Sequence, residues 1–170
     1  MAHLVLTVVG DDRPGLVNAL AEQVAAHGGN WERSELAELA GAFAGIVLVS
    51  VPDENQAAFV AALSDLDGLL RVTAHGGSAD ADAVPRDRAI ELTVLGNDRP
   101  GIIRDVTAAI AAHTLSIDTL RSRTLDAPMA GGILFEAVVA FRVPADTDAA
   151  AVTVALEQLA GEIQVDLTVA

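Results

Sequence analysis

The sequence predicts an α+β fold built twice, in which each copy is a four-stranded antiparallel sheet with two helices on one face. Three observations lead to this prediction: an internal repeat, an alternation of strand-like and helix-like patterns, and a polar stretch near the middle of the chain. The repeat is direct, because VGDDRPGL at 9–16 returns as LGNDRPGI at 95–102, a constant spacing of 86 residues. The chain is therefore predicted to be a duplication of one unit.

The first copy begins with a strand and a helix. Residues 3–9 form a short apolar run rich in β-branched residues, which is typical of a strand in the interior of a sheet. Leu16, Leu20 and Val24 then recur at helical spacing, and two consecutive glycines at 28–29 end the predicted helix. One face of this helix is expected to cover the sheet.

Four further elements complete the first copy. Residues 30–39 carry four charged side chains and are predicted to form an exposed edge strand. The apolar stretch within 43–51 predicts an interior strand, the helical period of 54–66 a second helix, and 69–75 a last strand. The order strand, helix, strand, strand, helix, strand is that of the ferredoxin-like arrangement.

The second copy repeats this plan after a polar linker. The expected elements are strands at 90–95, 116–124, 133–143 and 163–169, with helices from 100 and over 148–159. A longer turn at 126–132 is the largest difference between the copies. The predicted domains are 1–76 and 88–170, and residues 77–87 are the linker because they are rich in Gly, Asp and Pro and lack periodicity.

Composition narrows the functional classes. Of 170 residues, 52% are hydrophobic, and 24 acidic residues against 10 Lys and Arg give a formal charge of −14, with no lysine in the chain. Because nucleic-acid binding depends on cationic contacts with phosphate, direct DNA or RNA binding is not expected. No apolar segment is long enough to cross a membrane and the first residues do not resemble a signal peptide, so a soluble cytoplasmic protein is expected.

The chain offers little for metal, cofactor or covalent chemistry. It contains no cysteine, its four histidines are not spaced as metal ligands, and no serine lies in a nucleophile-elbow motif. The neighbouring carboxylates Asp11 and Asp12 lie in a turn and define no acid–base pair. A non-catalytic protein without a cofactor is therefore expected.

The repeated loop joins a strand to a helix and has chemistry of its own. Proline is tolerated at the first helical position, which predicts helices that begin at Pro14 and Pro100. Asp12 and Asp98 are then placed to accept from the first free amides, and Gly15 leaves the approach to those amides open. A helix start of this kind favours a carboxylate or another anion, although the same residues also suit a simple sharp turn.

The motifs GDDRPG and GNDRPG, with NWERS after the first helix, resemble those of the ACT domain, a regulatory module that binds amino acids. The resemblance covers both halves, and two such modules alone are similar to the glycine cleavage system transcriptional repressor family. It implies a non-catalytic sensor whose ligand is held at an interface between ACT modules, by the first loop and the start of the second strand. The implied ligand-binding residues are Gly10, Asp12, Pro14, Gly15, Leu16 and Asn30 in the first half, and Gly96, Asp98, Pro100, Gly101, Ile102 and Ser116 in the second. The backbone amide of Val17, with that of Leu16, is expected to hold the ligand carboxylate.

The resemblance leaves two readings of function open. In the first, an amino acid or similar small carboxylate binds and its presence is signalled to a partner regulatory protein. In the second, the chain is a ligand-free interaction module whose edge strands form a homodimer or recruit a partner. The roles of Arg13 and Arg99 are open as well, because each can attract a carboxylate or remain solvated beside its neighbouring aspartates.

Overall fold

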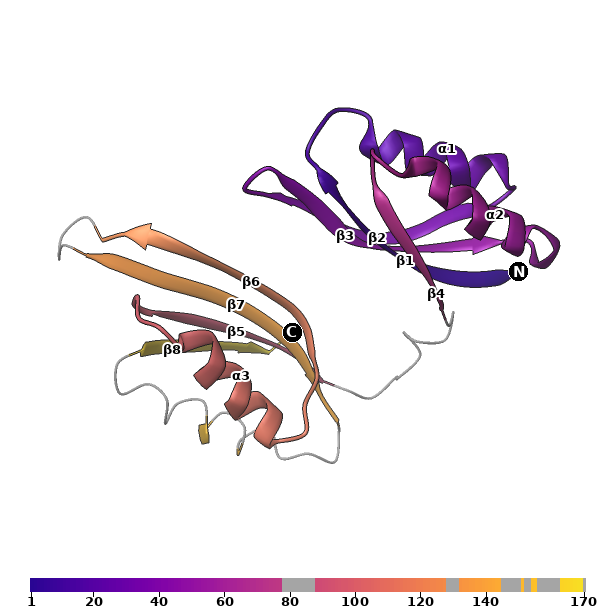
Figure 1. Ribbon diagram of the computed structural model, residues 1–170. Coiled ribbons are helices and arrows are strands. Elements are labelled where there is room, and N and C mark those ends of the chain that lie inside the picture. Colours follow the sequence, from indigo (N-terminus) through magenta and orange to yellow (C-terminus); the bar gives the residue numbers. More distant parts are fainter. Residues whose placement is uncertain (78–87, 128–131, 145–150, 152–153, 156–162, 170) are drawn as a thin grey trace. The chain divides into compact units, whose positions relative to one another are not determined.

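The computed structural model describes residues 1–77, 88–127, 132–144, 151, 154–155 and 163–169. The chain divides into two compact units, Met1–Ala83 and Val84–Ala170. Each unit contains one four-stranded antiparallel sheet, which confirms the predicted α+β class (Figure 1). Apart from Gly77, the linker expected at 77–87 lies outside the described residues.

The first unit has the predicted element order. Its strands are β1 (Ala2–Asp11), β2 (Asn30–Leu39), β3 (Ala42–Val51) and β4 (Arg71–Gly76), and its helices are α1 (Leu16–Ala26) and α2 (Gln56–Ala62). Short 3-10 turns at Asp53–Asn55 and Leu63–Leu66 flank α2. The strand order β2-β3-β1-β4 makes β2 an edge strand and places β1 and β3 inside the sheet, as predicted. Both helices cover the same face of this sheet (Figure 1).

Regular alternation builds the first core. Leu4, Leu6 and Val8 of β1 are buried because every second strand residue faces the helices. The residues that α1 buries recur every fourth position and meet these strand residues. The buried cluster consists of Leu4, Leu6, Val8, Leu16, Leu20, Val24, Val47, Val49, Val51, Phe59, Leu63, Leu66 and Leu70.

The second unit has the same topology. Its elements are β5 (Arg88–Asn97), α3 (Ile102–Ala112), β6 (Ile117–Asp126), β7 (Ile133–Val143) and β8 (Ile163–Val169), with strand order β6-β7-β5-β8. The helix expected over 148–159 falls mostly outside the described residues. Within that range residues 151 and 154–155 are described, and they are helical. No helix among the residues described in either unit is long and apolar enough to cross a membrane.

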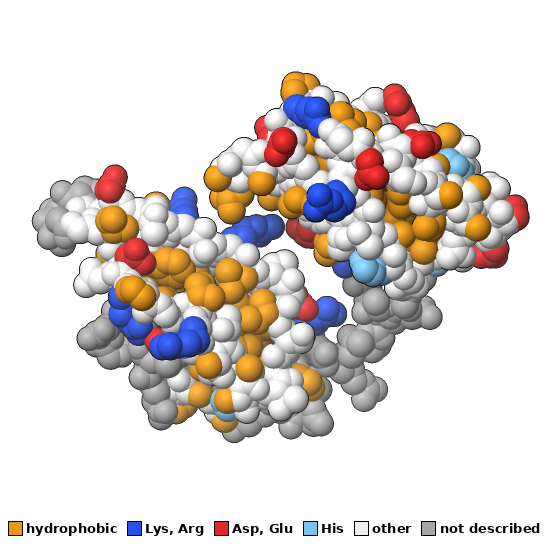
Figure 2. All heavy atoms as spheres, viewed as in Figure 1, with side chains coloured by type: hydrophobic (Ala, Val, Ile, Leu, Met, Phe, Trp, Pro, Cys, Tyr) orange, Lys and Arg blue, Asp and Glu red, His pale blue; other side chains and the backbone are white. Residues whose placement is uncertain are grey.

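The edge strands β2 and β6 both begin with a β-bulge, where an apolar side chain is followed by a charged one. The pairing of β2 with β3 skips Glu32, and the pairing of β6 with β7 skips Asp118. Trp31 and Ile117, which precede the skipped residues, pack against the core of their own units. A bulge at the same position in both units thus lets one apolar side chain reach the core while its neighbour stays polar. On the face shown in Figure 2, apolar side chains also reach the surface between charged ones.

Two residues other than glycine have left-handed backbone conformations. Ala40 has φ 53° and precedes Gly41, with φ 83°, in the two-residue turn between β2 and β3, where positive φ at both positions is favoured. Thr114 has φ 59° directly after the helix-end residue His113, at the position where the first unit has Gly28 with φ 69°. A side chain at positive φ crowds the backbone, and a β-branched one such as Thr114 is strained most.

Replacing the strained threonine is expected to stabilise the second unit. The substitution Thr114→Gly removes the crowding and is predicted to add about 1 kcal/mol to the free energy of unfolding. For a unit of this size that corresponds to an increase in melting temperature of about 4 to 8 °C, measurable by scanning calorimetry. Gly28→Thr is the matched control and is expected to destabilise the first unit, and a Thr114→Gly protein no more stable than the parent would contradict the prediction.

Candidate functional site

The repeated loop turns before its helix begins. Helix α1 begins at Leu16 and α3 at Ile102, so the predicted starts at Pro14 and Pro100 were wrong by two residues. Gly15, with φ 94° and ψ −4°, lies at the N-cap of α1, and the N-cap glycine of α3 has φ 91°. A proline followed by a glycine at positive φ is the signature of a type II turn. The Pro-Gly pair therefore makes the turn itself, and only then does the chain become helical.

The predicted caps were also wrong. Neither N-cap glycine is accompanied by a side-chain capping bond, so Asp12 and Asp98 do not accept from the first helical amides. Instead the backbone N–H of Asp12 donates to the Gly41 carbonyl at 2.8 Å, and that of Asp98 donates to the Ile133 carbonyl at 2.9 Å. Each aspartate thus ties its loop to the neighbouring strand hairpin through the backbone.

The later helix start leaves backbone donors at the loop. The first helical bond of α1 runs from the Ala19 N–H to the Gly15 carbonyl at 2.9 Å. The amides of Leu16, Val17 and Asn18 consequently have no acceptor within the helix. The Leu16 side chain is buried, whereas Val17 is 43% exposed. This end of α1 carries partial positive charge, which favours an anion.

The structure brings most of the predicted site residues together, in two separate groups. The first group lies at the end of β1 and the start of α1, and the second at the corresponding place in the other unit. The groups are Gly10, Asp12, Pro14, Gly15, Leu16 and Val17, and Gly96, Asp98, Pro100, Gly101 and Ile102.

Asn30 and Ser116 lie away from the loops of their own units. Gly10 pairs with Phe43 of β3, whereas Asn30 pairs with Ser50 of the same strand. Seven residues of extended chain separate these positions by about 23 Å, which is more than the length of an amino acid. Ser116 precedes β6 at the equivalent end of the second sheet and is exposed. Within one unit, a small ligand therefore contacts the loop or the polar residue, but not both.

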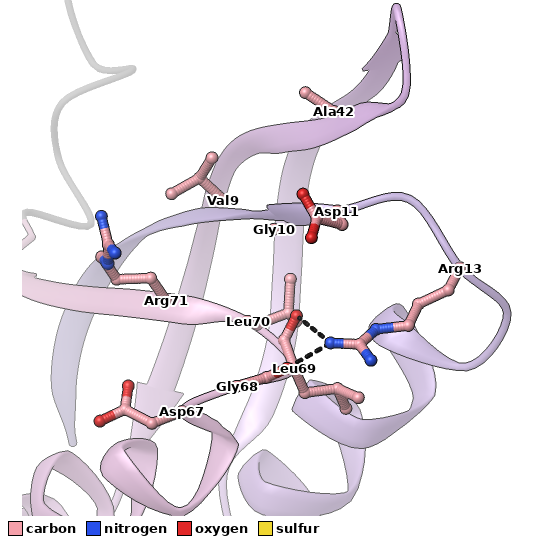
Figure 3. A pocket seen from close by; sticks show the side chains of 10 residues that line it. All are labelled: Val9, Gly10, Asp11, Arg13, Ala42, Asp67, Gly68, Leu69, Leu70 and Arg71. Carbon is pink, nitrogen blue, oxygen red and sulfur yellow. Dashed lines mark hydrogen bonds between the residues drawn. The ribbon is translucent and has the colours of Figure 1, made fainter.

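A hollow of about 580 Å³ lies beside the first loop (Figure 3). It is bounded by the end of β1, the start of β3 and the segment that leads into β4. Its lining residues are Val9, Gly10, Asp11, Arg13, Ala42, Asp67, Gly68, Leu69, Leu70 and Arg71.

The hollow exists because β4 is shorter than β1. The pairing of the two strands ends at Val9 and Arg71, while β1 continues to Asp11. At Gly10 a Cβ atom would lie 2.6 Å from the Leu69 carbonyl oxygen, so the two backbones approach too closely for any side chain. Gly10 is thus required by packing, a role that the sequence motif alone did not reveal.

Four charged side chains line the hollow. The Arg13 guanidinium donates to the carbonyl oxygens of Gly68 and Leu69, the latter at 3.4 Å, and so fixes the segment before β4 (Figure 3). Arg71 lies on the side opposite Arg13 (Figure 3) and, among the described residues, has no hydrogen bond or ion pair.

Two carboxylates complete this charged set. Asp11 belongs to β1, and Asp67 lies in the turn before β4. The sequence motif pointed to Asp11 only as part of a turn, and Asp67 and Arg71 were not predicted, because they are far from the loop in the sequence. The combination of two guanidinium groups and two carboxylates suits a ligand that carries both charges.

In the second loop, the arginine at the equivalent position pairs with a carboxylate. The Arg99 Nη1 lies 3.0 Å from Asp105 Oδ2, and Arg104 donates to Asp105 Oδ1 through Nη2 at 2.9 Å and Nε at 3.1 Å. The hydrogen bond from Arg104, and then that from Arg99, hold the pKa of the Asp105 carboxyl below its ordinary value. A carboxylate of the protein itself is therefore fixed in the first turn of α3.

In the described part of the chain, no group of three or more His, Asp or Glu side chains lies within reach of one metal ion.

Two compact units, each with a four-stranded antiparallel sheet of the same strand order and with the same Pro-Gly loop, define a tandem ferredoxin-like protein. Comparison with known families gives the particular class, since the ACT domain profile matches residues 2–75 and 89–170. The chain therefore belongs to the ACT domain family, whose members in tandem form include regulatory proteins.

Individual relatives agree with this assignment. The chain is 31% identical over 165 residues to the glycine cleavage system transcriptional repressors of Escherichia coli (strain K12) and Shigella flexneri, with 95% of this chain and 85% of each relative covered. The crystal structure of an unknown protein from Galdieria sulphuraria superposes with a TM-score of 0.87 at 30% identity, covering 99% of this chain and 98% of that one. A second solved structure, 23% identical, shares the fold with a TM-score of 0.73 and covers 99% of this chain and 97% of its own.

The Asp105 cluster predicts a measurable titration. In the Arg104→Ala protein the Asp105 carboxyl loses its largest source of stabilisation, and its pKa is expected to rise toward the ordinary aspartate value. Carbon-detected NMR of the side-chain carboxyl follows this titration directly. Because the pKa is depressed in the folded state, the interaction stabilises the fold above the unfolded pKa and is lost as the pH falls through the folded one.

The two arginines offer an internal comparison for this titration. Arg99→Ala is expected to raise the pKa of Asp105 less than Arg104→Ala does, because the Arg104 bond is the larger cause of the shift. An Asp105 pKa that stays the same in both variants would contradict the ion-pair geometry.

Proposed function

We propose that this protein is a non-catalytic regulator that binds an amino acid or a similar small carboxylate and signals its presence to a partner protein. The hollow beside the first loop is the observation that carries the proposal. Arg13, Arg71, Asp11 and Asp67 line this hollow of about 580 Å³, and Arg13 belongs to the loop that leads to a helix start with three amides that lack helical acceptors. A zwitterionic amino acid has a carboxylate for the arginines and an ammonium group for the aspartates.

The size of the hollow is compatible with a small ligand. Binding sites for small molecules usually have volumes of about 300 to 1,000 Å³, and this one lies near the middle of that range. An amino acid fills only part of it, so a longer carboxylate or bridging water molecules are accommodated as well.

The hollow also suggests how binding is signalled. Three segments distant in sequence border it: the end of β1, Ala42 at the start of β3, and the segment 67–71 that leads into β4. A ligand that contacts all three favours one arrangement of these segments over others. Such differential binding is the physical requirement for a signal to a partner.

The proposed partner is a protein rather than DNA. The relatives are named transcriptional repressors, which supports a role in transcriptional regulation, here proposed for amino-acid metabolism. However, the net charge of −14 and the absence of lysine disfavour direct contact with nucleic-acid phosphates. Basic and acidic side chains are also interspersed over the described residues on the face shown in Figure 2. Regulation through a DNA-binding partner reconciles these observations.

The exposed edge strands support a second candidate function. β2 and β6 each pair with one strand only, so their outer edges offer backbone groups to another chain. A ligand-free module would use these backbone groups to form a dimer or to bind a partner protein. Native mass spectrometry of the full chain separates a monomer from a homodimer.

Ligand binding predicts an increase in thermal stability. The full chain is screened by thermal shift against the standard amino acids, acetate and a set of small dicarboxylates. A ligand that binds only the folded state adds about 2.7 kcal/mol of stability at one hundred times its Kd, which raises the melting temperature by several degrees. Isothermal titration calorimetry then gives the Kd of each hit.

A control variant separates the site from nonspecific stabilisation. Arg123→Gln removes an exposed arginine of β6, in the second unit, that pairs with Glu136 at 2.7 Å, and this change should leave the shift intact. If none of these compounds shifts the melting temperature at millimolar concentration, the regulator is ligand-free and the interaction module becomes the better account.

A further inference from the structure

A charged side chain at the start of the edge strand β2 is held by a strand that β2 does not pair with. Glu32 is the residue that the pairing of β2 with β3 skips, so its backbone lies outside the regular ladder. Its carboxylate reaches the imidazole of His3 in β1, where Glu32 Oε1 lies 3.4 Å from His3 Nε2. A side-chain contact thus ties the bulge of β2 to β1.

This contact passes over the strand between β2 and β1. β3 separates the two in the sheet, and its residue Ser50 stands opposite both Asn30 and His3. Ser50 is small and buried, which leaves room for the two longer side chains to meet above it. The His3 and Glu32 side chains are themselves only 25% and 28% exposed, so solvent screens their interaction less than that of two surface charges.

The second unit holds the equivalent carboxylate with a different cation. At a spacing of 86 residues Asp118 corresponds to Glu32, and the pairing of β6 with β7 skips it in the same way. Arg142 of β7 donates to both Asp118 carboxylate oxygens, from Nε at 3.0 Å and from Nη2 at 3.1 Å. A guanidinium stays charged at any pH at which the protein is folded, whereas an imidazole exchanges its proton between about pH 5 and 8. The two bulges are therefore held alike but respond differently to pH.

The charges around His3 identify Glu32 as the group that responds to its protonation. Among the residues of β3, which lies directly beside His3, none is charged. The charged groups of the neighbouring elements are Arg33 and His75 on the same face of the sheet, and Met1 and Asp53 at its end, which pair with each other at 2.9 Å. A proton on His3 therefore adds attraction to the Glu32 carboxylate.

We propose that His3 and Glu32 form a pH-dependent clasp that fixes the start of β2 while the His3 ring is protonated. As the pH rises through the range in which histidine loses its proton, the attraction to Glu32 weakens and the first residues of β2 detach more often from β3. The pair of Asp118 and Arg142 keeps the start of β6 fixed throughout. Because β2 is an edge strand, the clasp changes how much regular strand edge the first unit presents to a partner chain. The clasp requires no small ligand.

Hydrogen exchange measured by NMR on the full chain tests the clasp. Protection factors, which correct for the intrinsic effect of pH on exchange, are compared at about pH 5.5 and about pH 8 for the amides that bond β2 to β3 beside Glu32. Protection there is expected to fall by about 1.5-fold to fivefold at the higher pH, the range that a partly exposed ion pair supports. The amides at the start of β6 are the internal control and should keep their protection.

Substitutions at the pair separate it from other titrating groups. His3→Arg supplies a permanent cation and should keep the start of β2 protected at both pH values. Glu32→Gln removes the carboxylate and should lower the protection at the acidic pH to the value that the parent protein has at the higher pH. His75→Gln is the matched control on the same face of the sheet and should leave the pH dependence as it is in the parent protein.

The clasp is overturned if protection at the start of β2 is independent of pH in the parent protein. A pH dependence that persists in His3→Arg or Glu32→Gln, or that disappears in His75→Gln, would assign the effect to another group and overturn it as well. So would an equal loss of protection in all strands of the first unit, because that is a global effect of pH. None of these results bears on ligand binding, which the thermal-shift screen measures separately.

Discussion

A left-handed glycine between a proline and a helix determines the backbone conformation of each strand-to-helix loop in this protein. Because Gly15 has φ 94°, the chain completes its turn before α1 begins, and the first helical amides come to lie at the end of the sheet. The loop is further held by the bond from Asp12 to the Gly41 carbonyl and by the contacts of Arg13 with the segment before β4. The loop in this conformation therefore contacts the turn between β2 and β3 and the segment before β4, and leads into α1.

Duplication preserved this backbone and changed its electrostatics. The strand orders, the bulges of the edge strands and the left-handed N-cap glycines are common to both units. The charges around the loops are not, since Arg13 donates to carbonyl oxygens while Arg99 pairs with Asp105. Backbone geometry is demanded by folding and so resists change, whereas surface charges are free to diverge between two copies of one fold.

The sequence predicted the fold well because the signals for it are local and repeated. Apolar periodicity placed β1 and β3 inside their sheet and β2 at its edge, as the strand order confirms. The helix starts were missed by two residues because the proline was assigned to the helix, whereas the positive φ of Gly15 places it in a turn. The sequence predicted only part of the candidate site. Its motif lies in one segment, but Asp67 and Arg71 join it through pairing of β4 with β1, which no short pattern encodes.

The packing of Trp31 gives the two units different optical properties. This indole is the only tryptophan in the chain and contacts the core of the first unit, while Ile117 takes the equivalent place in the second. Fluorescence excited at the red edge of protein absorption therefore originates in the first unit alone. Far-ultraviolet circular dichroism, in contrast, sums the backbone of both. Followed together during denaturation, the two signals resolve whether the duplicated halves unfold in one step or separately, without any label added to the protein.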